Sequence, residues 1–574
     1  MKRLLKYLRD YRKEAVCAPI FKILEASFEL CIPLVVAAMV DQGIPNADKG
    51  FLIKMCLLMV LLGAVGLTST LIAQYFAAKA ATGFAAKLRH ALMAHIQTMS
   101  YTDLDRIGTS TLITRMTSDI NQVQTGVNLG LRLLLRSPFI VFGAMIMAFT
   151  VDVRSALIFI ALITALSVVV FGIMLGTIPL YRKVQEQMDS VTDITRENLT
   201  GFRVLWAFRM ENAQAEKFKA ANHLLAKMQN HVGAISALMN PVTYLLVNGA
   251  IIALLYIGAV RVNAGRLSQG QVIALYNYMS QILVELIKLA SLIITLTKTA
   301  ACANRIADVL EDGGIPNEPD LSTLPTEHGT VVFEHVSLTY AGAGDASLTD
   351  ISFSAKQGET IGIIGGTGSG KTSLVNLIPR FYEPTEGCIM IDGIRSSNFP
   401  RKTLRERIGT VPQKAVLFQG TIRDNLRWGC PDADDDTIRS ALKTAQALDI
   451  VDSKPNGLDE WLEESGSNLS GGQRQRLTIA RALVGKPEIL ILDDSASALD
   501  FATDAALRKA LREIPENPTV FIVSQRTASI RFADKILVLE DGMLLDIGTH
   551  AELLERCDTY REIHESQFKG GDAS

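Results

Sequence analysis

A glycine-rich loop that ends in lysine and threonine carries the clearest chemistry in this sequence. Residues 365–372 read Gly-Gly-Thr-Gly-Ser-Gly-Lys-Thr, which fits the spacing G-x-x-x-x-G-K-[ST]. An apolar run, Thr360 to Ile364, precedes the loop and predicts a strand, and a helix is predicted to open at Ser373. Backbone N–H groups of such a loop point at phosphate oxygens, and the helix N-terminus adds positive potential. The predicted phosphate-binding residues are Gly365, Gly366, Thr367, Gly368, Ser369, Gly370, Lys371, Thr372 and Ser373.

The same loop predicts a magnesium site. Lys371 is expected to reach the outer phosphates, and Thr372 is expected to ligate the metal ion. A second predicted strand, Glu488 to Leu492, is followed by Asp493, whose carboxylate would hold the ion directly or through water. An aspartate at the end of a buried strand can also be merely structural. Beside a phosphate-binding loop, the metal-binding interpretation is favoured.

A third segment places serine and two glycines at the start of a predicted helix. Residues 468–476 read Asn-Leu-Ser-Gly-Gly-Gln-Arg-Gln-Arg, and Ser470 with the two glycines could cap a phosphate from a helix end. On its own, such a helix start is common and usually structural.

Together, these motifs resemble those of the ATP-binding-cassette (ABC) family, whose signature reads L-S-G-G-Q, and the resemblance covers essentially the whole chain. It implies ATP and Mg²⁺ as cofactors. It also implies that Tyr340 stacks on adenine and that Gln413, between two subdomains, contacts the nucleotide and its metal ion. In this family two ATP molecules are sandwiched between two domains, each phosphate loop facing the partner's signature. The implied signature residues are Ser470, Gly471, Gly472 and Gln473.

Two positions depart from the family pattern where hydrolysis would occur. The residue after the magnesium-binding aspartate is usually glutamate, which orients or deprotonates the attacking water, but this chain has Asp494. The family's switch histidine is replaced by Gln525, which cannot carry a positive charge near physiological pH. Because phosphoryl transfer relies on positioning, we expect weak hydrolysis at these two catalytic positions. The pair resembles the degenerate half of a heterodimeric exporter, whose signature completes the hydrolytic site of another chain.

The elements that position these motifs follow a long apolar half. Before about residue 298, several segments approach the length that a helix needs to cross a bilayer. Short polar links alternate with long connections rich in Lys and Arg, so the long connections, both termini and the soluble half are predicted to be cytoplasmic. The predicted spans are residues 15–40, 51–76, 137–150 with an extension backward, 156–180, 234–260 and 272–296.

The predicted fold class is a membrane α-helical unit of six transmembrane helices, followed by an α/β P-loop nucleotide-binding domain. We predict a transmembrane domain over residues 1–310, a linker over 311–328 and the nucleotide-binding domain over 329–574. An amphipathic helix at residues 1–14 is expected to lie on the membrane surface. The protein is therefore expected in the cell (inner, cytoplasmic) membrane as a multi-pass protein.

The membrane half resembles the exporter branch of the family, which implies movement of cargo out of the cytoplasm. In that branch, short helices at the tips of the two long connections press on the ATP domains, and here they are expected near residues 103–110 and 210–215. The matching positions include Gly108, Leu112, Thr114, Arg115, Thr117 and Asp119 in the first connection, and Glu197, Asn198, Leu199, Gly201, Arg203, Val204, Ala207 and Phe208 in the second.

Composition and motif count bear on the partners. A net charge of −2 offers no basic surface to nucleic acid, and the seven scattered cysteines indicate reduced packing residues. Each nucleotide motif occurs once, so a machine with two ATP domains requires a second half-transporter chain. We predict a heterodimer in the lipid bilayer.

Polar side chains within the spans give limited information on the cargo. Glu25 and Glu29 share one helix face, as do Glu285 and Lys288, which can neutralise each other. The first two could meet a cationic compound in a central cavity or be hydrogen-bonded inside the bundle, and both alternatives stay open. A weak preference results for small amphipathic, drug-like or lipid-like cargo of the multidrug type. The alternatives are a homodimeric lipid translocator and a nucleotide-gated channel or sensor with little transport.

Overall fold

The structure is a computed structural model that describes residues 2–311 and 328–568. Most of the predicted linker, 311–328, lies outside these described residues. The chain divides into two compact units. One contains the N-terminal segment up to Gln97 and the segment from Ser110 to the end of the last long membrane helix, and the other contains Thr98–Thr109 and the C-terminal part.

The first unit consists of helices, and its described residues include six helical segments long and apolar enough to cross a membrane. A 3₁₀-helix, Lys2–Tyr11, forms the start of the first segment, within the stretch predicted to be amphipathic. The α-helices of this unit are α1 (Arg12–Ala38), α2 (Lys49–Thr98), α4 (Thr109–Thr114), α5 (Ile120–Leu133), α6 (Arg136–Val151), α7 (Val153–Thr200), α8 (Phe202–Ala207), α9 (Glu211–Ala237), α10 (Met239–Asn263) and α11 (Gln269–Glu311).

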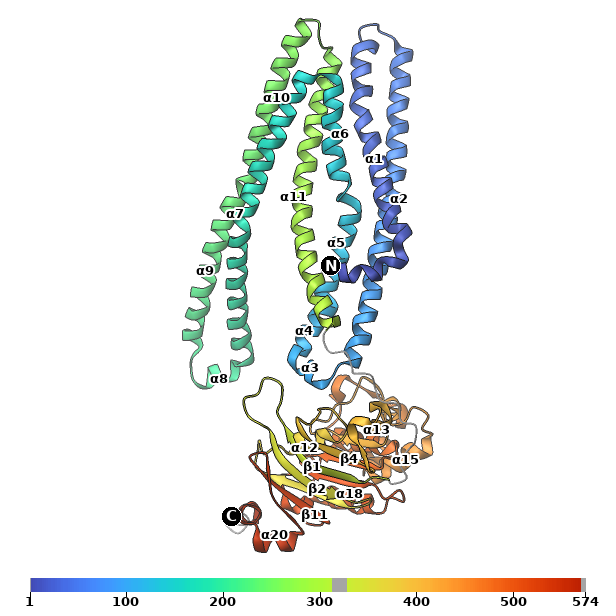
Figure 1. Ribbon diagram of the computed structural model, residues 1–574, viewed down its shortest axis with the longest axis vertical. Helices are drawn as coiled ribbons and strands as arrows, with labels where there is room; N and C mark the ends of the chain where they lie inside the picture. Colours follow the sequence, from blue (N-terminus) through green and yellow to red (C-terminus); the bar gives the residue numbers. More distant parts are fainter. Residues whose placement is uncertain (1, 312–327, 569–574) are drawn as a thin grey trace. The chain divides into compact units, whose positions relative to one another are not determined.

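The long helices extend past the bilayer, as the helical periodicity of the long connections predicts. Helix α2 has 50 residues, which at 1.5 Å per residue gives about 75 Å, against a hydrocarbon core of about 30 Å. Helix α7 packs on α9 and α10, and α11 packs on α1, α5 and α6 (Figure 1). Small residues such as Ala26, Ala144 and Ala274 are fully buried at these contacts and let the helix backbones approach closely.

The second unit is an α/β domain whose central sheet is mostly parallel. Its strands run in the order β12-β11-β3-β10-β9-β6, and β11, β3, β10, β9 and β6 are mutually parallel along that order, whereas β12 is antiparallel to β11. The strands are β3 (Thr360–Gly365), β6 (Ile408–Val411), β9 (Ile489–Asp493), β10 (Thr519–Val523), β11 (Lys535–Glu540) and β12 (Met543–Gly548). Because β3, β9 and β10 are parallel neighbours, the loops after their carboxyl ends meet at one edge of the sheet.

Smaller elements complete this unit. A four-stranded sheet has the order β2-β1-β4-β5, and β7 pairs with β8. These strands are β1 (Val331–Leu338), β2 (Leu348–Ala355), β4 (Glu386–Ile391), β5 (Ile394–Arg395), β7 (Gly420–Thr421) and β8 (Trp461–Leu462). The helices are α3 (Tyr101–Ile107), α12 (Lys371–Leu377), α13 (Arg401–Glu406), α14 (Ile422–Arg427), α15 (Asp435–Thr444), α16 (Leu448–Asp452), α17 (Gly471–Val484), α18 (Phe501–Arg512), α19 (Thr527–Ile530), α20 (His550–Arg556) and α21 (Asp558–Phe568).

The two short helices expected at the tips of the long connections turn out differently. Helix α3 overlaps the first expected position but starts earlier, because the Ser100 hydroxyl accepts a hydrogen bond from the Asp103 backbone N–H. It ends at Ile107, before Gly108, where φ is 79°. The second expectation, residues 210–215, is wrong, because those residues start α9. The short helix there is α8, which precedes a turn with Arg209 at φ 56°.

Candidate nucleotide-binding site

The glycine-rich loop connects β3 to α12, as its sequence predicts. Gly370, at the N-terminus of α12, has φ 90°. A Cβ atom at Gly370 would lie 2.7 Å from the carbonyl oxygen of Ser347 and 2.7 Å from the side chain of Leu348. This position therefore requires glycine on both conformational and steric grounds. Without a side chain at this position, the loop backbone can come close to the phosphate oxygens of a bound nucleotide.

Lys371 lies within the curve of this loop. Its Nζ atom donates to the carbonyl oxygens of Gly365, at 2.9 Å, and Gly366, at 2.5 Å, and the residue is 9% exposed. Burial lowers the pKa of Lys371, whereas the nearby carboxylates of Asp494 and Asp493 act to raise it. The loop thus holds the ammonium group close to where phosphates would bind.

Asp493 and Thr372 provide two oxygen ligands side by side. The Thr372 hydroxyl donates to Asp493 Oδ1 at 3.2 Å, and Asp493 is the last residue of β9. Burial raises the pKa of Asp493, and the hydrogen bond from Thr372 opposes that rise. A hydroxyl and a carboxylate at this spacing fit Mg²⁺, which prefers oxygen ligands.

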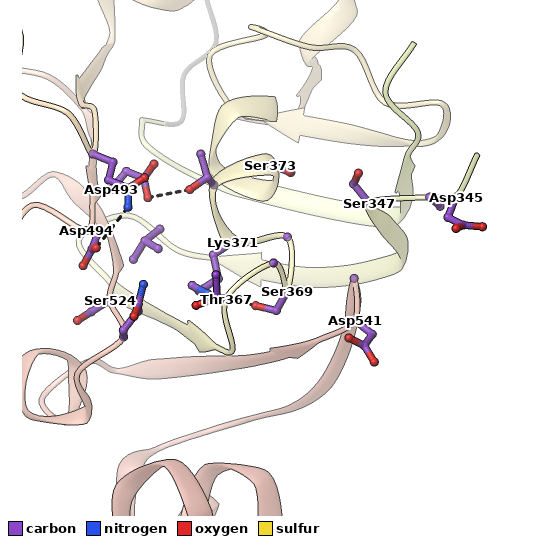
Figure 2. Close-up of a pocket in the computed structure, with 18 residues that line it drawn as sticks. Asp345, Ser347, Thr367, Ser369, Lys371, Ser373, Asp493, Asp494, Ser524 and Asp541 are labelled. Carbon is purple, nitrogen blue, oxygen red and sulfur yellow. Dashed lines mark hydrogen bonds between the residues drawn. The ribbon is translucent and has the colours of Figure 1, made fainter. Parts of the chain in front are cut away.

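A cavity of about 560 Å³ gathers most of the predicted residues. Figure 2 shows Asp493 and Asp494 on one side of it and Asp541 on the other, with Lys371 between them. The predicted residues that line it are Thr367, Gly368, Ser369, Gly370, Lys371, Thr372, Ser373, Gln413, Asp493, Asp494 and Gln525. The cavity therefore unites the phosphate loop with both atypical positions.

Tyr340 lies next to this cavity rather than in its lining. Its hydroxyl donates to the Ser373 side chain at 2.9 Å, and its ring packs edge-on against Tyr382, with ring centroids 4.9 Å apart. Tyr382 in turn donates to Asp105 of α3 at 2.6 Å. Burial, followed by the hydrogen bond to Asp105, raises the pKa of Tyr382. A continuous set of contacts therefore links α3 to the first turn of α12 through two tyrosines.

Asp494 and Gln525 lie on the loops that follow β9 and β10. Asp494 has φ 46°, which is uncommon for a residue with a side chain, and Gln413 Nε2 lies 3.5 Å from Asp494 Oδ2. The Gln525 loop is held from the C-terminal helix α21. Gln567 Nε2 donates to the Gln525 carbonyl oxygen at 2.7 Å, and Gln567 Oε1 accepts from the Thr527 backbone N–H at 2.9 Å.

Sequence reasoning missed several residues of this region, among them Gln567, Tyr382, Asp345, Ser347 and Asp541. Asp541 and Gly542 form the turn between β11 and β12, so the turn was recognisable from the sequence but its approach to the phosphate loop was not. Gln567 and Tyr382 act through contacts distant in sequence, and no local pattern marks them.

The signature residues occupy the start of α17, outside the lining of the cavity. The Ser470 hydroxyl accepts from the Gln473 backbone N–H at 3.3 Å, while Gln473 Oε1 accepts from the Ser470 backbone N–H at 3.0 Å. This reciprocal pair is a capping box. Ser470 and Gly471 are exposed. A Cβ atom on Gly472 would lie 3.1 Å from the Ala498 carbonyl oxygen. The capped helix end is therefore preformed and accessible.

The fold and this site define a membrane protein fused to a phosphate-loop nucleotide-binding domain, and comparisons with known proteins identify the family. Residues 16–286 match the ABC transporter transmembrane region, and residues 348–497 match the ABC transporter domain. An uncharacterised ABC transporter ATP-binding protein, YfiB, of Bacillus subtilis is 36% identical over 99% of both chains. An ATP-dependent lipid A-core flippase of Chromohalobacter salexigens is 30% identical over 99% of this chain and 98% of its own.

A solved structure extends the likeness to the fold. The structure of a bacterial Atm1-family ABC exporter with ATP bound has a TM-score of 0.82 and covers 98% of this chain and 99% of its own, at 23% sequence identity. The chain belongs to the ABC transporter family and is a half-transporter with the exporter fold. The predicted fold class is confirmed. The predictions that the protein is an ATP-hydrolysing transport ATPase, and that it is a multi-pass membrane protein with a cytoplasmic nucleotide-binding domain, are also confirmed. ABC exporters work as dimers.

Proposed function

We propose that this chain is the degenerate-site subunit of a heterodimeric exporter that moves amphipathic, drug-like or lipid-like compounds out of the cytoplasm. The observation that carries the proposal is that Asp494 and Gln525 line the same cavity as an intact phosphate loop. That combination suits retention of ATP better than its hydrolysis.

In this proposal, the chain's own site binds ATP persistently. The loop residues from Gly365 to Ser373 hold the phosphates, and Lys371 neutralises the outer ones. Tyr340 stacks on adenine. Thr372, Gln413 and Asp493 would hold Mg²⁺, which would neutralise charge on the phosphates. Asp494 is one methylene shorter than the usual glutamate and does not replace it as the catalytic base. Gln525 stays neutral and does not replace the switch histidine.

The exposed start of α17 serves a second site. Ser470 and Gly471 are exposed and Ser470 is fixed by its capping box, which supports a role for residues 470–473 in closing on ATP bound by the partner. Hydrolysis would then use the base and the switch histidine of the partner. The predicted domain bounds, 1–310 and 329–574 with the linker between them, are part of this proposal.

The shared site gives the most specific test. Ser470→Arg places a bulky cation at the capped helix end, so we expect phosphate release by the assembled complex to fall to background although this chain's phosphate loop is intact. Ser440→Arg, on the exposed face of α15, is the matched control and should retain full turnover. Undiminished turnover in the Ser470 variant would refute the shared site.

A homodimeric lipid translocator is the second candidate, because relatives at 30% and 29% identity are named lipid A-core flippases. It predicts that the chain moves a fluorescent lipid between leaflets without any partner. The heterodimer proposal predicts no such movement by the chain alone.

A further inference from the structure

A buried arginine organises a cluster of charges in the membrane unit. Arg136, at the start of α6, is 7% exposed. Its Nη1 atom lies 2.6 Å from a carboxylate oxygen of Glu285 on α11, and its Nη2 atom lies 2.7 Å from Glu29 and 3.8 Å from Glu25 on α1. One guanidinium therefore ties three helices together through three acidic side chains.

Two lysines balance the remaining charge. Lys22 lies 2.5 Å from Glu25, and Lys288 lies 2.9 Å from Glu285. The cluster thus contains three basic and three acidic side chains. Charges at membrane depth are costly unless they are paired, and this cluster is neutral as a whole. Glu25 is occupied by Lys22 and Arg136, which argues against a cation held jointly by Glu25 and Glu29.

Three members of the cluster, Glu29, Glu285 and Lys288, line a cavity of about 370 Å³ between α1 and α11. The side chains of Glu29 and Lys288 are 37% and 44% exposed, whereas those of Lys22, Glu25, Arg136 and Glu285 are 4–16% exposed. The cavity is also lined by apolar Ile32, Pro33 and Val284. Gln281 lines it too, and its Oε1 atom is buried without a hydrogen-bond partner in the described part of the chain.

We propose that this cavity binds a small amphipathic zwitterion, with its ammonium group at Glu29, its anionic group at Lys288 and its apolar body against Ile32, Pro33 and Val284. This inference names the substrate class and rests on the proposed export function. A ligand with a single charged group would pair with only one of the two exposed side chains. The other side chain would then meet either a group of its own charge or an uncharged group. A zwitterion satisfies both and leaves the cluster neutral.

A matched series of dipeptides tests the charge requirement. Leucyl-leucine is a zwitterion, leucyl-leucinamide is a cation and N-acetyl-leucyl-leucine is an anion, and all three share one apolar body. Equilibrium binding is measured to the full chain in nanodiscs of phosphatidylglycerol without nucleotide. We expect the zwitterion to bind about tenfold more tightly than the other two. Binding that is equal across the series, or tightest for the cation or the anion, would overturn the proposal.

Variants of the two exposed side chains test the orientation. Glu29→Gln should weaken leucyl-leucine about tenfold and leave the N-acetyl anion unchanged, whereas Lys288→Gln should weaken leucyl-leucine and leave the cation unchanged. Glu211→Gln and Lys219→Gln, exposed on α9, are the matched controls. Unchanged binding of the N-acetyl anion by Glu29→Gln, and of the cation by Lys288→Gln, shows that the membrane unit of each variant is folded. Loss of all three ligands to the same extent in either variant would contradict the assignment.

The same binding assay distinguishes a lipid headgroup from a free solute as the source of the zwitterion. If a lipid headgroup is the natural ligand, nanodiscs of phosphatidylethanolamine will compete with leucyl-leucine. If a free solute is the natural ligand, phosphatidylethanolamine will not compete with leucyl-leucine. Both outcomes support a zwitterion site. Because no nucleotide is present, these results stand apart from the heterodimer proposal, which is judged by phosphate release.

Discussion

The difference between aspartate and glutamate at residue 494 is one methylene, yet it sets the distance between a carboxylate and the attacking water. Asp494 already takes an uncommon backbone conformation, with φ 46°, and its carboxylate lies 3.5 Å from Gln413. In phosphoryl transfer, the position of the base decides much of the rate. We therefore propose that Asp494 and Gln525 make hydrolysis weak at this chain's own site.

Restoring both side chains should restore hydrolysis. We expect the double variant Asp494→Glu, Gln525→His to raise phosphate release by the chain purified alone by at least about tenfold, because a positioned base and a chargeable histidine return to an intact phosphate loop. The same variant with Lys371→Ala should return to background. Unchanged turnover in the double variant would mean that the defect lies elsewhere.

The buried carboxylate of Asp493 gives a pH dependence. Burial raises the pKa of Asp493, and the protonated carboxyl group is a poor ligand for Mg²⁺. Affinity for Mg·ATP should therefore be lost as pH falls through this raised pKa, at a higher pH than the ordinary value of about 3.9 would give. Titration of a fluorescent ATP analogue with Mg²⁺, and with EDTA as the control, measures this. An equal pH dependence in the two titrations would contradict it.

At the scale of elements, α21 supports the loop that carries Gln525. Gln567 makes hydrogen bonds to Gln525 and Thr527, so it fixes the loop from its outer side. We predict that Gln567→Ala speeds release of a fluorescent ATP analogue several-fold, as expected for a hydrogen bond worth about 1 kcal/mol. Glu562→Ala, exposed on the same helix, should not change the rate. Equal rates for both variants would limit α21 to a packing role.

The elements differ in how far the sequence predicts them. The strand, loop and helix around Lys371 follow from local patterns, because glycine spacing and an apolar run act over a few residues. The helix at residues 210–215 was misplaced, because the end of α7 and the turn at Arg209 are set by backbone geometry that the residue types only weakly specify. The charge cluster around Arg136 could not be predicted from local patterns, since its partners Glu29 and Glu285 lie more than 100 residues away in sequence.

At the scale of the whole molecule, one chain supplies one nucleotide-binding domain and one set of membrane helices, and an exporter needs two of each. ATP binding can bias such a dimer between conformations only if the nucleotide has a different affinity for each. A site that retains ATP would keep one side of the interface between the two nucleotide-binding domains closed. Hydrolysis at the other site would let the dimer open again. Two unlike chains would thus divide ATP retention and ATP hydrolysis between them.

This division between two chains can be tested by the phosphate release of this chain purified alone in lipid, compared with Lys371→Ala and with the chain copurified with a candidate partner. A heterodimer with one hydrolysing site predicts background turnover for the chain alone and brisk turnover beside the partner. Brisk, Lys371-dependent turnover by the chain alone would contradict it and would establish a working homodimer.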